Sequence, residues 1–238
     1  MAEQTRNPAN DSTFMDVDKM LGTRLRFVVS LRCTLGEDLY KLVNATEPTP
    51  FSINFQLCNV GKSSFEKRCT LLDASGRKLG QTSKQMVLVD EVSRKPVPIP
   101  EWWKRKHGSQ GVLREKKEVF QYALHVPAEN TYQYSMKPSW NDVDSYHHVN
   151  YVSYVMFCFD AAMDAIKHGF YIGFFDDILK YNVKTLQIRF MGEALAGDNL
   201  TVVTWQDAQN LRIIHFSIER EGNALVQCSI EFFLRAKL

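Results

Sequence analysis

The sequence predicts an α+β protein made of two copies of one unit, each an antiparallel sheet wrapped around a central helix. The chain has 238 residues, which is room for one large domain or two smaller ones. Both halves follow the same order: an Asp-Val-Asp triplet, a helix, then strands with a glycine-containing hairpin. The triplets begin at Asp16 and Asp142, and the hairpin glycines are Gly76 and Gly222. This shared order indicates a tandem duplication more than the short triplet does.

The composition is that of a folded globular protein. Hydrophobic residues make up 45% of the chain and charged residues 24%, which excludes disordered, collagen-like and disulfide-scaffold classes. No stretch approaches the ~18 consecutive apolar residues of a membrane span. The net charge of +2 argues against a protein whose main ligand is nucleic-acid phosphate.

The cysteines indicate a reducing compartment. The chain has five, an odd number, and none forms a C-x-x-C pair. We therefore expect buried free thiols and neither a disulfide framework nor a zinc site. Residues 1–13 contain no apolar signal core, so we expect a short disordered leader on a cytoplasmic protein.

The first copy is expected over residues 14–94 and begins with a helix. Within 21–42 the apolar residues are three and four apart, which is the helical period. They are Leu21, Leu25, Val28, Leu31, Leu35, Leu39 and Leu42. Three strands are expected next, with a hairpin turn between the last two at 73–77. Their ranges are 51–57, 65–72 and 78–92.

Residues 95–118 differ in composition and are expected to form an ordered linker across the surface. Three prolines, Pro96, Pro98 and Pro100, remove backbone donors and resist regular structure. The segment also holds basic clusters at 104–107 and 114–117. These clusters could contact an acidic partner or could form a solvated charged face.

The second copy is expected over residues 119–238. Residues 151–167 are apolar on nearly all sides, which is typical of a buried helix. Strands are expected before and after this helix, and a turn at 220–223 joins the last two. Their ranges are 118–126, 132–138, 184–190, 199–207, 211–219 and 224–234.

The most distinctive stretch is WNDVDSYHHVNY at 140–151, directly before the buried helix. It holds two carboxylates, two histidines and two asparagines. A helix start presents free backbone N–H groups and a partial positive charge, which can polarise a carbonyl and stabilise an oxyanion. A carboxylate in the preceding loop could act as general base on water or as nucleophile. The arrangement therefore suits acyl transfer or hydrolysis.

A simpler interpretation of the same residues stays open. Asp142 or Asp144 could merely cap the helix, and His147 and His148 could be ordinary loop residues. Adjacent histidines cannot supply the i, i+4 geometry of a zinc site, so we expect no metal.

The stretch WNDVDSYHHVNYVSYV resembles the W-x-D-x-D-x-x-x-H-V-N-N-x-x-Y signature of hotdog-fold thioesterases. It is most similar to the acyl-ACP thioesterases, double-hotdog enzymes that release fatty acids from acyl carrier protein. The segment IRFMGEALAGD at 188–198 resembles the family strand that ends in E-A-x-x-G-D. Further family-like segments are VGKSSF, LLDASGRKL and PVPIPEW in the first half. The resemblance implies a tandem hotdog fold.

By position, the resemblance also implies roles for single residues. Asp144 matches the catalytic aspartate, His148 the histidine four residues later, and Glu193 the glutamate of the downstream strand. The amide near Tyr151 matches the donor that polarises the thioester carbonyl. Asn150 matches an asparagine that we expect to fix the loop at the substrate site.

Three positions depart from the family pattern. Tyr146, expected beside the substrate, replaces an asparagine of the plant-type enzymes. His147 replaces a common glycine, and Tyr151 replaces the second asparagine of V-N-N. Tyr146 could mean altered chemistry or a binding protein without catalysis. The loop after Asp18 has no His or Asn, so we expect the first copy to be structural.

The leading hypothesis is a thioesterase that hydrolyses acyl-CoA or acyl-ACP and needs no cofactor. Asp144 or Glu193 would activate water, and His148 would orient or assist. A non-catalytic acyl-binding or scaffold protein is the alternative, and a hotdog dehydratase is a third candidate. The resemblance also implies an internal pseudo-dimer, alone or as a homodimer, with one competent site that the second copy supplies and the first copy walls.

Overall fold

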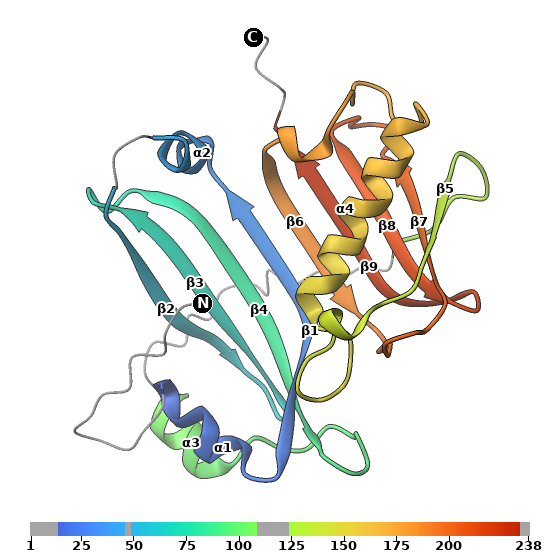
Figure 1. Ribbon diagram of the computed structural model, residues 1–238. Helices are drawn as coiled ribbons and strands as arrows, with labels where there is room; N and C mark the ends of the chain where they lie inside the picture. The colour runs from blue at the N-terminus through green and yellow to red at the C-terminus, as the bar shows by residue number, and fades with distance from the viewer. Residues whose placement is uncertain (1–13, 46–48, 109–123, 234–238) are drawn as a thin grey trace.

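A computed structural model describes residues 14–45, 49–108 and 124–233 of the chain. Its strands form one antiparallel nine-stranded sheet within these ranges, in the order β2-β3-β4-β1-β6-β9-β8-β7-β5 (Figure 1). They are β1 (Arg24–Leu35), β2 (Phe51–Val60), β3 (Ser64–Asp73), β4 (Lys78–Asp90), β5 (Tyr132–Met136), β6 (Val183–Phe190), β7 (Leu200–Gln206), β8 (Ile213–Arg220) and β9 (Asn223–Phe232). The predicted fold class is confirmed.

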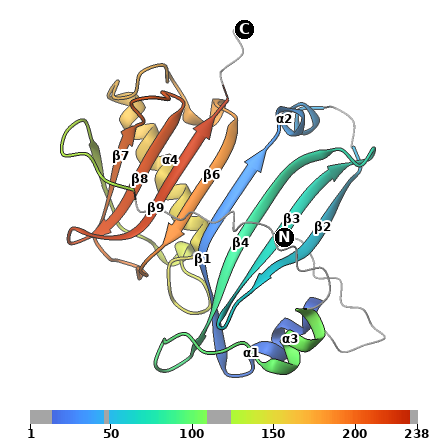
Figure 2. The same cartoon turned by 180° about the vertical axis from the view of Figure 1, so that it is seen from behind.

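The two halves of the molecule share this sheet through a single strand pair. β1 of the first half pairs with β6 of the second, from Ser30 opposite Arg189 to Thr34 opposite Thr185. The halves lie side by side along the sheet, with β2 and β5 at its outer edges (Figures 1 and 2). Two units therefore pair within one chain.

The central helix of the second half is α4 (Tyr151–Lys167), with the bounds that the sequence predicts. Asn150 caps its start, because its side-chain oxygen accepts a hydrogen bond from Val152 N–H at 3.0 Å. The helix ends before Gly169, whose φ of 68° suits glycine. Its inner face is buried against the sheet, and three alanines allow close approach. The buried residues are Tyr154, Phe157, Cys158, Ala161, Ala162, Ala165 and Ile166.

The helix predicted over 21–42 is wrong for most of that range. Residues 24–35 form β1, which pairs with β4 on one side and β6 on the other. Only the short α2 (Glu37–Val43) follows. Steps of four also fit a strand, since they are multiples of two. A register shift between Val28 and Ser30 absorbs the step of three from Val28 to Leu31, so that these two residues face the same side, whereas Leu25 faces the other side.

Among the described residues, one face of the first-half sheet consequently has no long helix packed on it. Strand register places Phe55, Cys69, Thr82 and Cys33 in one row with Leu186, a buried residue of the cluster around α4. This row therefore lies on the α4 side of the sheet. Among the described residues, Figure 1 shows α4 in front of the second half of the sheet and no long helix in front of β2, β3 and β4. The exposed side chains at its outer end are Phe51, Ile53 and Phe55.

The base of the first half is closed by α1 (Val17–Leu21) and α3 (Glu101–His107). Trp103 of α3 is fully buried, and its indole N–H donates to the carbonyl of Met15 at 2.7 Å. The second cluster of buried hydrophobic residues gathers here, apart from the one around α4. It consists of Met20, Leu57, Phe65, Met86, Leu88, Ile99 and Trp103.

Several smaller expectations have mixed outcomes. The segment predicted as a surface linker over 95–118 contains α3 and part of the core, and its last ten residues lie outside the described ranges, as does the leader over 1–13. Of the strand predicted over 118–126, only 124–126 are described, and they are not a strand.

The Asp-Val-Asp triplets are not equivalent, since one begins α1 and the other ends in the loop before α4. All five cysteines are free.

An ion pair between α3 and Asp16, in the part of the first half that α1 and α3 close, predicts a pH dependence of stability. Asp16 is buried, and its Oδ2 lies 2.7 Å from Lys106 Nζ and 2.9 Å from His107 Nε2. Hydrogen bonds from Lys106 and His107 hold the pKa of Asp16 below its usual value. A lowered folded-state pKa stabilises the protein above the unfolded-state pKa of about 3.9, and this contribution is lost as the pH falls through the folded value.

Asp16→Asn should therefore lower the melting temperature near neutral pH. The difference from wild type should shrink toward zero in acid, because wild-type Asp16 is then protonated as well. Thermal unfolding followed by circular dichroism across this range measures it. A deficit that is equally large at pH values below the folded pKa would contradict the electrostatic explanation.

Candidate active site

The loop before α4 separates the two aspartates that the sequence could not tell apart. Asp142 ends a short 3-10 helix (Trp140–Asp142), and its Oδ2 accepts hydrogen bonds from the N–H and hydroxyl of Ser139 at 2.7 and 2.8 Å. The capping interpretation thus fits Asp142, although the helix it caps is the short one. Asp144 has different surroundings.

Asp144 is the first residue of a tight turn that ends at His148. Its N–H donates to the carbonyl of His148 at 2.9 Å, and its Oδ1 accepts from Tyr146 N–H at 2.9 Å. Its second carboxylate oxygen makes no hydrogen bond to another described residue, and the residue lines a cleft. One oxygen is therefore fixed by the loop while the other is available to a ligand.

His148 and Glu193 are brought together as a pair. His148 Nε2 lies 3.3 Å from Glu193 Oε2, and the histidine is mostly buried while the glutamate is half-exposed. His148 Nδ1 is buried and has no hydrogen-bond partner in the described part of the chain. A carboxylate at one ring nitrogen orients the imidazole, while the other ring nitrogen is enclosed by the protein.

Hydrogen bonds tie the Glu193 segment to the start of α4. The carbonyl of Ala194 accepts from Val149 N–H at 2.9 Å, and Ala194 N–H donates to the hydroxyl of Tyr154 at 2.9 Å. Burial raises the pKa of Tyr154 to about 12, so the hydroxyl stays neutral. The downstream glutamate is thus held against the helix start despite the 42 residues that separate it from Tyr151 in sequence.

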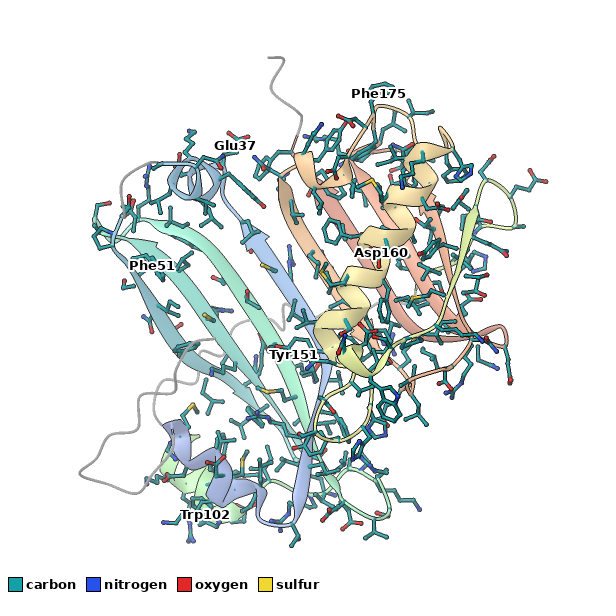
Figure 3. All side chains as sticks on the ribbon, in the orientation of Figure 1. Glu37, Phe51, Trp102, Tyr151, Asp160 and Phe175 are labelled. Atoms are coloured by element: carbon teal, nitrogen blue, oxygen red, sulfur yellow. The ribbon has the colours of Figure 1, made fainter. Side chains whose placement is uncertain are left out.

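The first turn of α4 offers a backbone donor. Asn150 N–H donates to the carbonyl of Asp142 at 2.7 Å, and its side chain occupies Val152 N–H. Tyr151 N–H, by contrast, has no acceptor among the described residues. Because helix N-termini carry a partial positive charge, this N–H can polarise a carbonyl oxygen. Figure 3 shows Tyr151 at the beginning of α4, between the two halves.

All six predicted site residues line one cleft of about 720 Å³ between the halves. They are Asp144, Tyr146, His148, Asn150, Tyr151 and Glu193. Sequence reasoning treated the first copy as a wall and named none of its residues. The structure adds Phe27, whose ring lies 6.2 Å from that of Tyr146 and 6.4 Å from that of His148.

Lys84 is a second contribution of the first half. Its Nζ lies 2.8 Å from the hydroxyl of Tyr151 and 4.3 Å from the centre of that ring. Strand register places it there, because Lys84 opposes Leu31, which in turn opposes Ile188 under α4. No local sequence signal distinguishes this lysine from the other basic residues of the strands.

A strained backbone at His147 accounts for the glycine common at this position in the family it resembles. His147 has a φ of 60°, in the left-handed region that costs a non-glycine residue about 1–2 kcal/mol. His147→Gly should raise the free energy of unfolding by about 0.5–1 kcal/mol, after the larger chain entropy of glycine is subtracted. Urea unfolding measures the change, and a destabilised variant would mean that the imidazole makes a compensating contact.

Groups of three or more His, Cys, Asp or Glu side chains able to hold a metal ion are absent from the described ranges. In the same ranges, no helix is long and apolar enough to cross a membrane.

Comparison with known proteins agrees with this geometry. The family model described as the acyl-ACP thioesterase C-terminal domain matches residues 126–234. The predicted family resemblance is confirmed for this half. The matched region contains α4, the Asp144 loop and the Glu193 segment, which are the parts that form most of the cleft. No curated protein sequence matches the chain.

Solved structures extend the likeness to both halves. The 12:0-ACP thioesterase from Umbellularia californica aligns with a TM-score of 0.69 at 14% identity, over 92% of this chain and 79% of that one. An acyl-ACP thioesterase from Bacteroides thetaiotaomicron aligns with a TM-score of 0.63 at 14% identity, over 92% and 79%. At such identity the likeness establishes the fold, which is the double hotdog.

Proposed function

We propose that this protein is an acyl thioesterase that hydrolyses an acyl-ACP or acyl-CoA thioester. The observation that carries the proposal is the convergence of Asp144, the His148–Glu193 pair and the Tyr151 amide on one cleft. The family match over residues 126–234 supports the same reaction class.

In the proposed mechanism, Asp144 acts as the general base. Its unoccupied oxygen takes a proton from a water molecule, and the resulting hydroxide attacks the thioester carbonyl carbon. The carbonyl oxygen becomes an oxyanion, which the Tyr151 N–H at the start of α4 stabilises. Loop hydrogen bonds hold Asp144 in place, so little reorganisation is needed when the charge develops.

Collapse of the intermediate completes the hydrolysis. The carbonyl re-forms, the C–S bond breaks, and the leaving thiolate receives the proton that Asp144 took from water. The products are a carboxylic acid and the free thiol of the carrier. His148 and Glu193, joined through His148 Nε2, line the cleft as a pair that positions the water or the leaving sulfur.

We assign the first half a positioning role. Phe27 packs against Tyr146 and His148 and so holds the turn from the opposite wall. Lys84 holds the Tyr151 hydroxyl and thereby fixes the first turn of α4. Tyr146, at the position of a plant-type asparagine, is proposed to contribute packing in place of a hydrogen bond.

The carrier and the compartment are part of the proposal. Both acyl carrier protein and CoA present the thioester on the same kind of thiol arm, so the cleft chemistry fits either. The free cysteines favour a reducing compartment, and we propose the cytoplasm.

A panel of acyl-CoA and acyl-ACP thioesters, assayed by thiol release, tests the function. Turnover of at least one chain length is expected, with loss of turnover in Asp144→Asn. Absence of turnover across both carriers would refute the thioesterase proposal.

A second candidate is an acyl-binding protein without turnover. The observation that favours it is Tyr146, whose ring packs on Phe27. Its phenol stands at the position of the plant-type asparagine and has no side-chain amide. It predicts calorimetric binding of a fatty acyl thioester that stays intact, and an Asp144→Asn variant that binds as well as wild type.

A further inference from the structure

The candidate cleft is lined by more basic than acidic side chains. Apart from His148, four basic side chains line it against two carboxylates. They are Arg26, Lys84, Arg94 and Arg220, and Asp144 and Glu193. A thioester and its acyl chain carry no charge, so the excess of positive charge indicates an anionic group elsewhere on the ligand.

Two of these basic groups already have partners within the protein. Arg220 Nη1 lies 2.7 Å from the carboxylate of Asp198, and Lys84 Nζ donates to the tyrosine hydroxyl at the start of α4 at 2.8 Å. The side chains of Arg26 and Arg94, by contrast, make no ion pair or hydrogen bond with another residue of the described ranges. Two guanidinium groups of the cleft are therefore available to a ligand.

An aromatic ring holds Arg94 at the wall of the cleft. Its guanidinium carbon lies 5.5 Å from the centre of the Phe27 ring, and Phe27 in turn packs against Tyr146 and His148. A cation–π contact of this kind restrains the guanidinium without using its N–H donors. Arg94 is thus one aromatic ring away from the His148–Glu193 pair, with its donors still free.

A hydrogen-bonded turn presents Arg94 to the cleft. Asp90 Oδ1 accepts from the N–H and the hydroxyl of Ser93, both at 2.8 Å, and the Asp90 carbonyl accepts from Arg94 N–H at 3.0 Å. In Figures 1 and 2 the segment after β4 loops past the end of β1 toward the second half before it returns to α3. Arg94 has a φ of 56°, in the left-handed region that favours glycine. The turn thus holds a long cationic side chain at a backbone cost that is typical of binding and active sites.

We propose that Arg94 binds the phosphate group that joins the pantetheine arm to its carrier, an inference that rests on the proposed thioesterase function. This phosphate is common to acyl-CoA and acyl-ACP, and a guanidinium can donate two parallel hydrogen bonds to its oxygens. The arm is about as long as four extended residues, roughly 14 Å. The steps from Arg94 to Phe27 and from Phe27 to His148, 5.5 and 6.4 Å, lie within that reach. A phosphate at Arg94 therefore leaves the thioester free to reach Asp144 and the Tyr151 amide.

Calorimetric binding of two thioethers that cannot be hydrolysed tests the site. The probes are S-dodecyl-4′-phosphopantetheine and S-dodecyl-pantetheine, which differ only in the phosphate. Wild type should bind the phosphorylated probe at least about tenfold more tightly, and this preference should shrink at high salt. Arg94→Gln should abolish the preference, whereas Lys95→Gln, which removes a charge from the exposed neighbour outside the cleft lining, should keep it. A wild type that binds both probes equally or binds neither, or an Arg94→Gln variant that keeps the preference, would overturn the proposal.

Hydrolysis assays separate the failure of this site from the failure of the proposed function. Arg94→Gln should raise KM for both acyl-CoA and acyl-ACP by about tenfold with little change in kcat, and should leave the kinetics of acyl-pantetheine unchanged. A rise for acyl-CoA alone would assign the anion to the nucleotide of CoA and overturn the assignment to the shared phosphate. Turnover without any phosphate preference would overturn this inference and leave the proposed function standing, whereas a phosphate preference without turnover would do the reverse.

Discussion

Asp144→Asn should lower kcat for thioester hydrolysis by about 10²–10⁴-fold, with a small effect on KM. The amide keeps the size of the side chain and can still accept from Tyr146 N–H, so the turn should survive. It cannot take a proton from water, and the loss should match what a general base usually contributes. Stopped thiol-release assays on the best substrate of the panel give both constants.

Asp142→Asn is the matched comparison, because it lies two residues away in the same loop. Its carboxylate caps the 3-10 helix, so its loss should cost about 1 kcal/mol of stability and leave kcat within a few-fold of wild type. If Asp142→Asn were inactive and Asp144→Asn active, the base would be assigned to the wrong aspartate. If both were active, Glu193 would be the remaining carboxylate to test.

Trp103→Ala should destabilise the protein by about 3–5 kcal/mol. Trp103 is fully buried between α3 and the sheet, its ring lies 5.5 Å from that of Phe65, and its indole N–H is paired with the Met15 carbonyl. Truncation opens a cavity in a small cluster, which has seven buried members among the described residues. Urea unfolding with an intrinsic fluorescence or circular dichroism signal measures the loss.

Trp102→Ala serves as the neighbour that should not matter. Trp102 is 37% exposed, so its truncation should change the free energy of unfolding far less than that of Trp103. Equal losses at both positions would mean that helix α3 itself, and not the buried indole, accounts for the effect. A mild loss at Trp103 alone would mean that the base of the first half can collapse around the gap.

The local sequence pattern was sufficient to predict an element where the burial of one face, or a single motif, determines the structure. The apolar run at 151–167 predicted α4 to the residue, because a helix that is buried this extensively is apolar nearly all round. The β2, β3 and β4 ranges were right within a few residues, since a hairpin turn at Asp73–Arg77 limits the register of its strands. The motif at 140–151 located the candidate cleft because five of the predicted site residues lie within this one stretch of sequence.

The first-half helix shows where pattern fails. Apolar spacing over 21–42 fits a helix, yet β4 and β6 offer that segment hydrogen-bond partners along both edges. A bulge then reconciles the spacing with a strand. Pairing between residues distant in sequence decided the outcome, and no local propensity contains that information.

The sequence by itself determined the fold class, the family resemblance of the second half, and the candidate residues Asp144, His148 and Glu193. Tertiary structure decided which aspartate caps and which faces the cleft, that Glu193 meets His148, and that Phe27 and Lys84 of the first half complete the site. Residue type and spacing fix what a side chain can do, whereas its neighbours depend on strand register and on the pairing of two halves.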